Sequence, residues 1–211
     1  MASKFRQEKY STMTPASKLI ILEGPSGSGK SSLAAALQES LLPGIWLGFS
    51  MDTLIYTLPP SVLHRCNTAN DWSGVDGRAI GAAALACLRA LVECGNKVIF
   101  DLCIPSRQYA DTFQAGIQDL SPVKVGVRCD WQEIERRTRH RADRSIEEAE
   151  RTFKHQHPFP DYDFMIDTTG IGPDAAAMEC LASFRHLLDG PGPTGSAPQA
   201  DAEQGGGNSP V

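Results

Sequence analysis

The stretch LIILEGPSGSGKSSLAAAL, residues 19–37, decides the fold that we expect for this chain. Residues 18–24 form an apolar run typical of a buried strand, and residues 29–42 have the pattern of a helix that ends before Pro43. Between them, residues 24–31, GPSGSGKS, fit the pattern G-x4-G-K-[ST]. A strand, a glycine-rich loop and a helix in this order indicate a P-loop, which holds the phosphates of a nucleotide.

The residue types in this loop explain how it would hold phosphates. Its glycines let successive backbone N–H groups point inward at phosphate oxygens, and the following helix adds its positive N-terminal end. The Lys30 ammonium reaches the β- and γ-phosphates, and the Ser31 hydroxyl is a ligand for Mg²⁺. We therefore expect a bound nucleotide, with ATP as the default, and Mg²⁺. The nucleotide-binding residues predicted in the loop are Gly24, Pro25, Ser26, Gly27, Ser28, Gly29, Lys30, Ser31 and Ser32.

Short apolar runs and longer helical patterns alternate along the rest of the chain. A helix of small residues is predicted over 77–95, with Gly95 as its C-terminal stop. Strands that alternate with helices indicate an α/β fold with a parallel sheet, and we expect a P-loop kinase-like three-layer sandwich with helices on both faces and an arginine-rich helical lid. The further predicted strands are 45–50, 97–102, 123–130 and 163–169.

The two ends of the chain differ from its middle. Residues 1–17 are polar and lack periodicity, and residues 190–211 are rich in Gly, Pro, Ala and Ser. Such segments bury too little apolar surface to offset the entropy lost on ordering. We expect a flexible N-terminal segment over 1–17, a kinase domain over 18–189 with its lid near 135–157, and a disordered tail over 190–211.

Composition narrows the class of protein. The 211 residues carry a formal net charge of −5, which argues against a nucleic-acid partner because backbone phosphates attract clustered Lys and Arg. No apolar run reaches the ~20 residues of a membrane span, and the N-terminus lacks the apolar region of a secretory signal. The six cysteines show no CxxC pair, which is typical of reduced thiols. We expect a cytoplasmic protein whose partner is a small molecule, with neither nucleic acid nor membrane bound; the oligomeric state stays open.

A carboxylate near the end of one strand is placed to hold a metal. Asp101 closes the run KVIFD and suits the Walker B position, which contacts Mg²⁺ directly or through water. The alternative is a turn aspartate at a strand end. Leu102 follows, so no second carboxylate supports the metal from that position. Ser31 and Asp101 are the predicted metal-binding pair.

An arginine-rich segment, ERRTRHRADRSIEEAERTFKH (135–155), fits the mobile lid of a small-molecule kinase. At helical spacing Arg137, Arg141 and Arg144 lie on one face, and the planar fork of arginine binds phosphate oxygens in pairs. Such arginines neutralise charge on the phosphoryl group during transfer. The alternative is a solvated helix held by Glu–Arg pairs. The chain has no N-K-x-D motif, which favours a kinase over a GTPase switch.

Asp52 is a candidate base for the acceptor. It lies in GFSMDTLIYTLPP (48–60), just beyond the second predicted strand. Ligands of such sheets bind outside the carboxyl ends of the strands, so Asp52 would face the acceptor and could take the proton of its hydroxyl. The alternative is that Asp52 caps the helix that begins at the next residue. Spacing alone leaves both interpretations open.

These pieces together resemble the chloramphenicol phosphotransferase-like family, P-loop antibiotic O-phosphotransferases. The resemblance runs from about residue 19 to 188. Besides the P-loop, it rests on WLGFSMDTLIYTLP (46–59), GNKVIFD (95–101), VGVRCD (125–130) and HPFPDYDFMIDTT (157–169).

The resemblance implies an ATP- and Mg²⁺-dependent enzyme that phosphorylates a hydroxyl of an antibiotic, chloramphenicol-like or a nucleoside antibiotic, and confers resistance by inactivating it. It implies that Asp52 is the base, and that Asp167, Thr168 and Thr169 lie near the base and ribose of the nucleotide. His157 has a counterpart in the family, but we favour a structural role for it. The catalytic residues implied are Asp52, Lys30, Arg137, Arg141 and Arg144.

Two stretches, 60–76 and 103–118, do not match the family, and we expect them to line the acceptor pocket. The acceptor therefore stays open. One alternative is a kinase of a primary metabolite, such as a sugar, a shikimate-like alcohol or a nucleoside; another is a non-catalytic nucleotide-binding regulator. A metabolite with its own phosphate or carboxylate would need cations nearby, for which the candidates are Arg65, Arg78 and Arg107.

Overall fold

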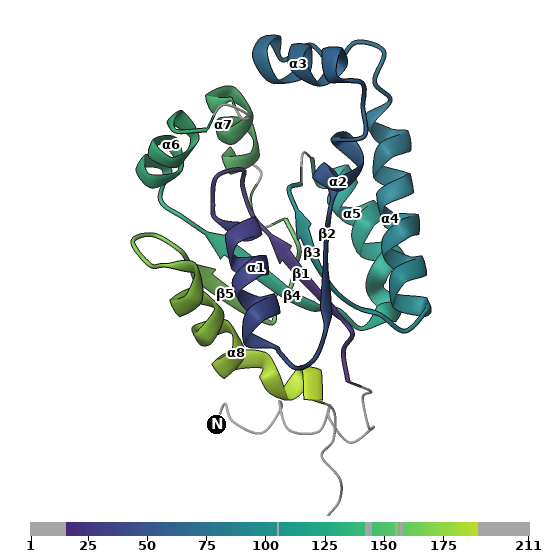
Figure 1. Ribbon diagram of the computed structural model, residues 1–211, viewed down its shortest axis with the longest axis vertical. Helices are drawn as coiled ribbons and strands as arrows, with labels where there is room; N and C mark the ends of the chain where they lie inside the picture. Colours follow the sequence, from purple (N-terminus) through teal and green to yellow (C-terminus); the bar gives the residue numbers. More distant parts are fainter. Residues whose placement is uncertain (1–15, 105, 142–144, 155, 157, 190–211) are drawn as a thin grey trace, which may run out of the picture.

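A parallel sheet forms the centre of the computed structural model, which describes residues 16–104, 106–141, 145–154, 156 and 158–189 (Figure 1). The strand order is β2-β3-β1-β4-β5, and every neighbouring pair is parallel. The α/β fold is therefore confirmed, and each strand lies within about two residues of its predicted bounds. The strands are β1 (Leu19–Glu23), β2 (Trp46–Ser50), β3 (Lys97–Leu102), β4 (Val123–Arg128) and β5 (Phe164–Asp167).

Helices cover both faces of this sheet. In Figure 1, α1 and α8 lie on one face, whereas α4 and α5 lie on the other. The helices are α1 (Lys30–Ser40), α2 (Met51–Ile55), α3 (Pro60–Ala69), α4 (Gly77–Glu93), α5 (Arg107–Ile117), the short 3-10 helix η2 (Gln118–Leu120), α6 (Trp131–Arg139), α7 (Ile146–Lys154) and α8 (Pro173–Asp189). The predicted three-layer arrangement is confirmed.

The central strand β1 is buried on both sides because its residues alternate between two cores. Ile20 and Leu22 pack with residues of α1 and α8, and Leu19 and Ile21 pack with residues of α4 and α5. All four side chains are fully buried. A strand in the middle of a parallel sheet has no polar face, which explains the unbroken apolar run at this point of the sequence.

The strand order places the ends of three strands next to one another. Leu22 of β1 pairs with Asp101 of β3, and Asp101 in turn pairs with Ser50 of β2. The P-loop follows β1, so it lies beside Asp101 and beside the turn that leads from β2 into α2. In a doubly wound sheet, the crevice outside these carboxyl ends is where ligands bind.

The lid consists of two helices, α6 and α7, at the carboxyl edge of the sheet (Figure 1). They share a small core of their own, separate from the two cores of the sheet. Trp131 and Phe153 pack against this core, with ring centroids 5.4 Å apart. The buried members of the core are Cys129, Ile134 and Ala149.

The helical lid is confirmed, but its predicted arginine face is not. Helix α6 ends at Arg139 and Arg141 lies beyond it, so Arg137 and Arg141 do not share one helix. The expected spacing is wrong because the chain leaves the helix after His140, which is the C-terminal cap of α6. Arg144 lies outside the described residues.

Several other expectations concern residues at the edge of the description or beyond it. The segments 1–15 and 190–211, and His157, lie outside the described residues. Ser17, at the end of the expected N-terminal segment, is buried, and its Oγ donates a hydrogen bond to the Ser121 carbonyl oxygen at 2.8 Å. All six cysteines are free thiols, as expected.

Candidate active site

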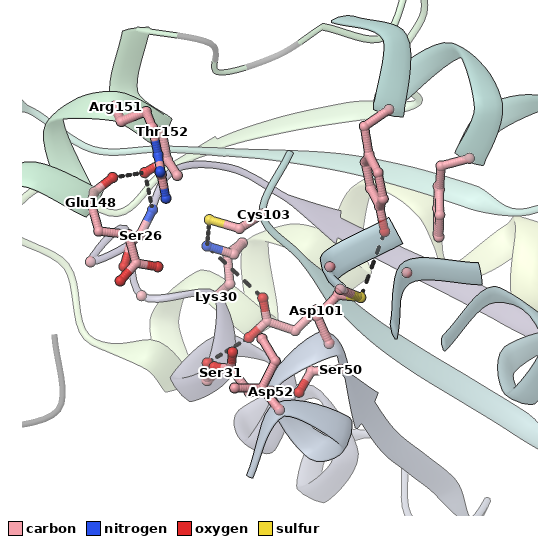
Figure 2. A pocket seen from close by; sticks show the side chains of 18 of the residues that line it. Ser26, Lys30, Ser31, Ser50, Asp52, Asp101, Cys103, Glu148, Arg151 and Thr152 are labelled. Carbon is pink, nitrogen blue, oxygen red and sulfur yellow. Dashed lines mark hydrogen bonds and ion pairs between the residues drawn. The ribbon is translucent and has the colours of Figure 1, made fainter. Parts of the chain in front are cut away.

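A cavity of about 1410 Å³ opens at the carboxyl edge of the sheet (Figure 2). The P-loop and the lid form one half, and α2, α4 and α5 form the other. Its volume is larger than the roughly 300 to 1,000 Å³ of a pocket for one small molecule. The cavity therefore has room for a nucleotide and an acceptor side by side.

The P-loop is shaped by glycines at positions where other residues would distort it. Gly27 and Gly29 have φ values of +83° and +91°, in the left-handed region that favours glycine. A Cβ atom on Gly24 would lie 2.3 Å from the backbone oxygen of Val127 in β4. The glycine pattern that predicted the loop is thus a requirement of its backbone.

Gly24→Ala is expected to destabilise the fold by about 1 to 3 kcal/mol, because the new methyl group would push β1 away from a neighbouring backbone that cannot yield easily. Thermal or urea unfolding measures the change. Gly77→Ala is the matched control: Gly77 begins α4, and a Cβ there meets nothing within 4 Å. Equal stability of Gly24→Ala and the wild type would contradict the close approach of β1 and β4.

Lys30 is held inside the loop. Its Nζ donates a hydrogen bond to the Pro25 carbonyl oxygen at 2.8 Å and lies 3.9 Å from Oδ1 of Asp101. Cys103, which the sequence did not single out, lies on its other side, with Sγ 3.7 Å from the same nitrogen. Burial raises the pKa of the Cys103 thiol, which therefore stays neutral beside the ammonium.

Ser31 and Asp101 meet as the sequence predicts for a metal pair. The Ser31 hydroxyl donates a hydrogen bond to Oδ2 of Asp101 at 2.5 Å. A hydroxyl and a carboxylate are the hard oxygen ligands that suit Mg²⁺. The described residues contain no cluster of three His, Cys, Asp or Glu that could hold a metal by themselves. The pair thus fits a Mg²⁺ ion that shares its coordination with phosphates and water.

Asp52 lies in the first turn of α2 and faces the cavity. Ser50 is the cap of that helix: its Oγ accepts a hydrogen bond from the Thr53 N–H at 3.3 Å. The capping interpretation of Asp52 is therefore wrong, because the cap position falls two residues earlier. Figure 2 shows Asp52 next to Ser31 and Asp101, at the meeting point of the two halves of the cavity.

Arg137 braces one end of the P-loop. Its guanidinium donates to Oε1 of Glu133 at 2.7 Å and to the Thr168 carbonyl oxygen at 2.9 Å, and it lies against Gly29. Thr168 also touches the loop, since its Oγ1 donates to the Ser28 carbonyl oxygen at 2.7 Å. Both residues line the half of the cavity formed by the P-loop and the lid, which we call the nucleotide half.

The other two residues predicted near the base and ribose do not line the cavity. Asp167 accepts a hydrogen bond from the Thr169 N–H at 2.9 Å, and hydrogen bonds from Thr169 lower the pKa of this carboxyl. Thr169 in turn accepts one from the Asp130 N–H at 2.9 Å. The two side chains hold the turn after β5 in shape. Residues further on, Ile171, Gly172, Pro173 and Ala176, line the cavity instead.

The lid contributes more residues than the sequence predicted. Arg141 lines the cavity, as expected. Three residues of α7, Glu148, Arg151 and Thr152, line it as well. The Ser26 N–H in the P-loop donates a hydrogen bond to Oγ1 of Thr152 at 3.0 Å, so the lid touches the loop directly (Figure 2). The spacing of Glu148, Arg151 and Thr152 along α7 could have indicated that they share one face of the helix, but not that this face points into the cavity.

A buried carboxylate just before the P-loop also escaped the sequence analysis. Glu23, the last residue of β1, is 1% exposed, and its Oε2 accepts a hydrogen bond from the Tyr162 hydroxyl at 2.8 Å. Burial raises the pKa of Tyr162, so its hydroxyl stays a donor at any physiological pH. The hydrogen bond between Glu23 and Tyr162 thus connects the end of β1, where the P-loop begins, to the segment before β5.

The half of the cavity formed by α2, α4 and α5, which we call the acceptor half, has mainly apolar walls. Tyr109 is one of its lining residues: burial raises the pKa of this phenol, and its hydroxyl donates to the Met51 sulfur at 3.6 Å. Trp72 lines this half and is exposed, whereas Trp46 is buried in the core. The other apolar wall residues include Ile55, Val75, Ala82, Leu85 and Phe113.

Two arginines of α4, Arg78 and Arg89, line this half, and Arg89 is paired with Asp119 at 2.7 Å. Arg65 and Arg107 do not line it, because each is held elsewhere. Arg65 pairs with Asp71 at 2.9 Å, and Arg107 pairs with Asp111 at 3.1 Å. Of the three candidate cations for an anionic acceptor, one faces the cavity.

Residues 17–185 match the chloramphenicol phosphotransferase-like protein family. The chain belongs to this family. A Mycobacterium tuberculosis protein (strain H37Rv) that carries the provisional name O-phosphotransferase is 26% identical over 189 residues, which cover 81% of this chain and 84% of that protein.

Solved structures share the fold of this phosphotransferase-like chain. A gluconokinase from Sinorhizobium meliloti 1021 has a TM-score of 0.60 and 19% identity, and the match covers 83% of this chain and 96% of that one. A tunicamycin resistance protein from Deinococcus radiodurans has a TM-score of 0.52 and 19% identity, covering 79% and 94%. The family and the kinase fold together make this chain an ATP-dependent phosphotransferase. Across the described ranges, no helix is both long and apolar enough to cross a membrane.

Proposed function

We propose that this chain is an ATP- and Mg²⁺-dependent O-phosphotransferase that phosphorylates a hydroxyl of an antibiotic, chloramphenicol-like or a nucleoside antibiotic, and so inactivates it. One observation carries the choice of acceptor: the half of the cavity that Asp52 faces has mainly apolar and aromatic walls. Such walls suit a bulky alcohol with an uncharged body. ATP use and six free cysteines fit a cytoplasmic protein.

The reaction follows from the positions of Asp52 and Lys30. The acceptor hydroxyl gives its proton to the Asp52 carboxylate, and its oxygen forms a bond to the γ-phosphorus of ATP. The bond from that phosphorus to the β–γ bridging oxygen breaks, and ADP leaves with the electron pair. Lys30 and the loop N–H groups hold the phosphate oxygens, so the protein acts by positioning and charge stabilisation.

Ser31 and Asp101 would hold Mg²⁺ in this site. When bound, Mg²⁺ neutralises charge on the β- and γ-phosphate oxygens. Ser31→Ala removes one oxygen ligand, and we expect the Mg²⁺ concentration needed for half-maximal ATP binding to rise about tenfold or more. Calorimetric titration with ATP at several Mg²⁺ concentrations measures it, with Ser183→Ala, an exposed serine of α8, as the control. An unchanged Mg²⁺ requirement would remove Ser31 from the metal site.

A kinase of a primary metabolite is the second candidate, and Arg78 is the observation that favours it. A guanidinium in the acceptor half could bind the carboxylate of an acidic sugar or of a shikimate-like alcohol. The fold does not choose between these acceptors, because both the gluconokinase and the tunicamycin resistance protein have it.

A panel of acceptors tests the proposal. The protein is incubated with Mg²⁺ and ATP and with chloramphenicol, tunicamycin, gluconate or shikimate, and the products are read by mass spectrometry. An antibiotic heavier by one phosphoryl group supports the proposal. Turnover of gluconate or shikimate, with none of the antibiotics, would replace it by the metabolite kinase. Tight ATP binding with no acceptor modified would indicate a nucleotide-binding regulator.

A further inference from the structure

Lid helix α7 is anchored to the P-loop by Thr152. This side chain is 5% exposed, and its Oγ1 accepts a hydrogen bond from the Ser26 N–H at 3.0 Å. The same hydroxyl donates to the carbonyl oxygens of Glu148 and Ala149, each at 3.0 Å. Because all partners of this hydroxyl are fixed backbone groups, the turn of α7 around Thr152 has a defined place above the loop.

Arg151 is the neighbour of this anchor and lines the cavity. Figure 2 shows its side chain beside Thr152, on the side of the cavity where Ser26 lies. Within the described part of the chain, its guanidinium forms no ion pair or hydrogen bond. The arginines of α6 differ: Arg136, Arg137 and Arg139 each form a 2.7 Å ion pair with a glutamate of their own helix.

The place of Arg151 indicates which part of a nucleotide it would meet. Arg137 lies against Gly29, where α1 begins, whereas Arg151 lies near Ser26, at the start of the loop. Lys30 also points toward that start, since its Nζ contacts the Pro25 carbonyl oxygen at 2.8 Å. The P-loop lysine reaches the β- and γ-phosphates. Lys30 and Arg151 therefore lie at the same end of the loop, where the γ-phosphate would be bound.

We propose that Arg151 is a catalytic residue that binds the γ-phosphate, with Thr152 as the positioning residue that holds it there. This inference rests on the proposed phosphotransfer. Arg151 donates hydrogen bonds to the equatorial oxygens of the γ-phosphoryl group and transfers no proton. As the acceptor oxygen bonds to phosphorus and the bond to the bridging oxygen breaks, the guanidinium balances charge on those oxygens.

Comparing two nucleotides tests the role of Arg151 without any acceptor. Affinities for AMP-PNP, a non-hydrolysable ATP analogue, and for ADP are measured by calorimetry with Mg²⁺. We expect Arg151→Gln to weaken AMP-PNP binding about tenfold or more, the loss of a charge-assisted hydrogen bond, and to change ADP binding little. Arg139→Gln is the matched control, since Arg139 pairs with Glu135 and does not line the cavity; it should leave both affinities near those of the wild type.

Two further variants separate the effect of the hydrogen bond between Thr152 and Ser26 from the effect of the Arg151 charge. Thr152→Val keeps the shape but removes the oxygen that accepts from Ser26, and we expect a smaller loss of AMP-PNP affinity in the same direction. Arg151→Lys keeps the charge without the planar fork and should fall between the wild type and Arg151→Gln. Because Arg151 is exposed, its variants should unfold at the temperature of the wild type.

The outcomes distinguish this inference from the function on which it rests. If Arg151→Gln weakens AMP-PNP and ADP equally or leaves both unchanged, Arg151 does not bind the γ-phosphate, and the phosphotransferase proposal stands. If the wild type binds neither nucleotide, the proposed function falls and this inference falls with it.

Discussion

Asp52→Asn is expected to lower kcat by roughly 10²- to 10⁴-fold while ATP still binds. Asparagine has the size of aspartate and can orient an acceptor hydroxyl, but it cannot take the proton. Asp52 faces the cavity from the first turn of α2, whose cap is Ser50, so the substitution removes no helix cap. Acceptor-stimulated ADP release, with the acceptor found in the panel, measures kcat, and calorimetry measures ATP binding.

Asp111→Asn is the matched control for this substitution. Asp111 is an exposed residue of α5 that pairs with Arg107 at 3.1 Å, and it does not line the cavity. A surface pair of this kind contributes little to stability, so this variant should keep the turnover of the wild type. Near-normal kcat in Asp52→Asn would show that Asp52 is not the base.

Lys30→Met is expected to lower kcat by about 10²- to 10³-fold, because it deletes one hydrogen-bond donor to the phosphoryl oxygens on which charge develops. ATP binding should weaken as well, since the same ammonium binds the ground-state phosphates. Methionine fills a similar volume, but it leaves the mostly buried Asp101 carboxylate without the ammonium 3.9 Å away, and removing one partner of a buried ion pair is destabilising. We therefore expect the variant to unfold at a lower temperature than the wild type, and kcat and ATP affinity are compared at a temperature at which both proteins are folded.

Lys18→Met is the control for the loss of one lysine charge. Lys18 is exposed and precedes β1, at the amino end of the sheet, opposite the P-loop. It should keep both ATP affinity and kcat. If Lys30→Met binds ATP as tightly as the wild type and turns over normally, the phosphates do not lie in the loop as proposed.

Much of the nucleotide half of the cavity could be predicted, because the residues expected to bind phosphate lie close together in the sequence. Gly24, Gly29, Lys30 and Ser31 stand within eight consecutive residues, and the strand and helix on either side fix the shape of the loop. Asp101 could be found as well, since a carboxylate at the end of a strand in a parallel sheet reaches the same edge as the P-loop.

The lid shows where spacing alone misleads. The prediction assumed one helix through Arg137, Arg141 and Arg144, but His140 ends α6. A break of this kind depends on the small core that α6 and α7 share, because packing between helices overrides the local helical preference of the sequence. Arg151 lay inside the quoted segment, yet its direction depends on the bond between Thr152 and Ser26.

By itself, the sequence determined the fold class and the P-loop, because the hydrophobic period and the glycine positions are properties of neighbouring residues. It also predicted that Ser31 and Asp101 hold a metal, and the structure brings these two side chains together. Only the tertiary structure decided which side chains face the cavity. Segments far apart in the chain, such as α2, α4 and α7, meet there, and their contacts depend on packing. Arg78 therefore faces the cavity, while Arg65 and Arg107 are held by nearby carboxylates.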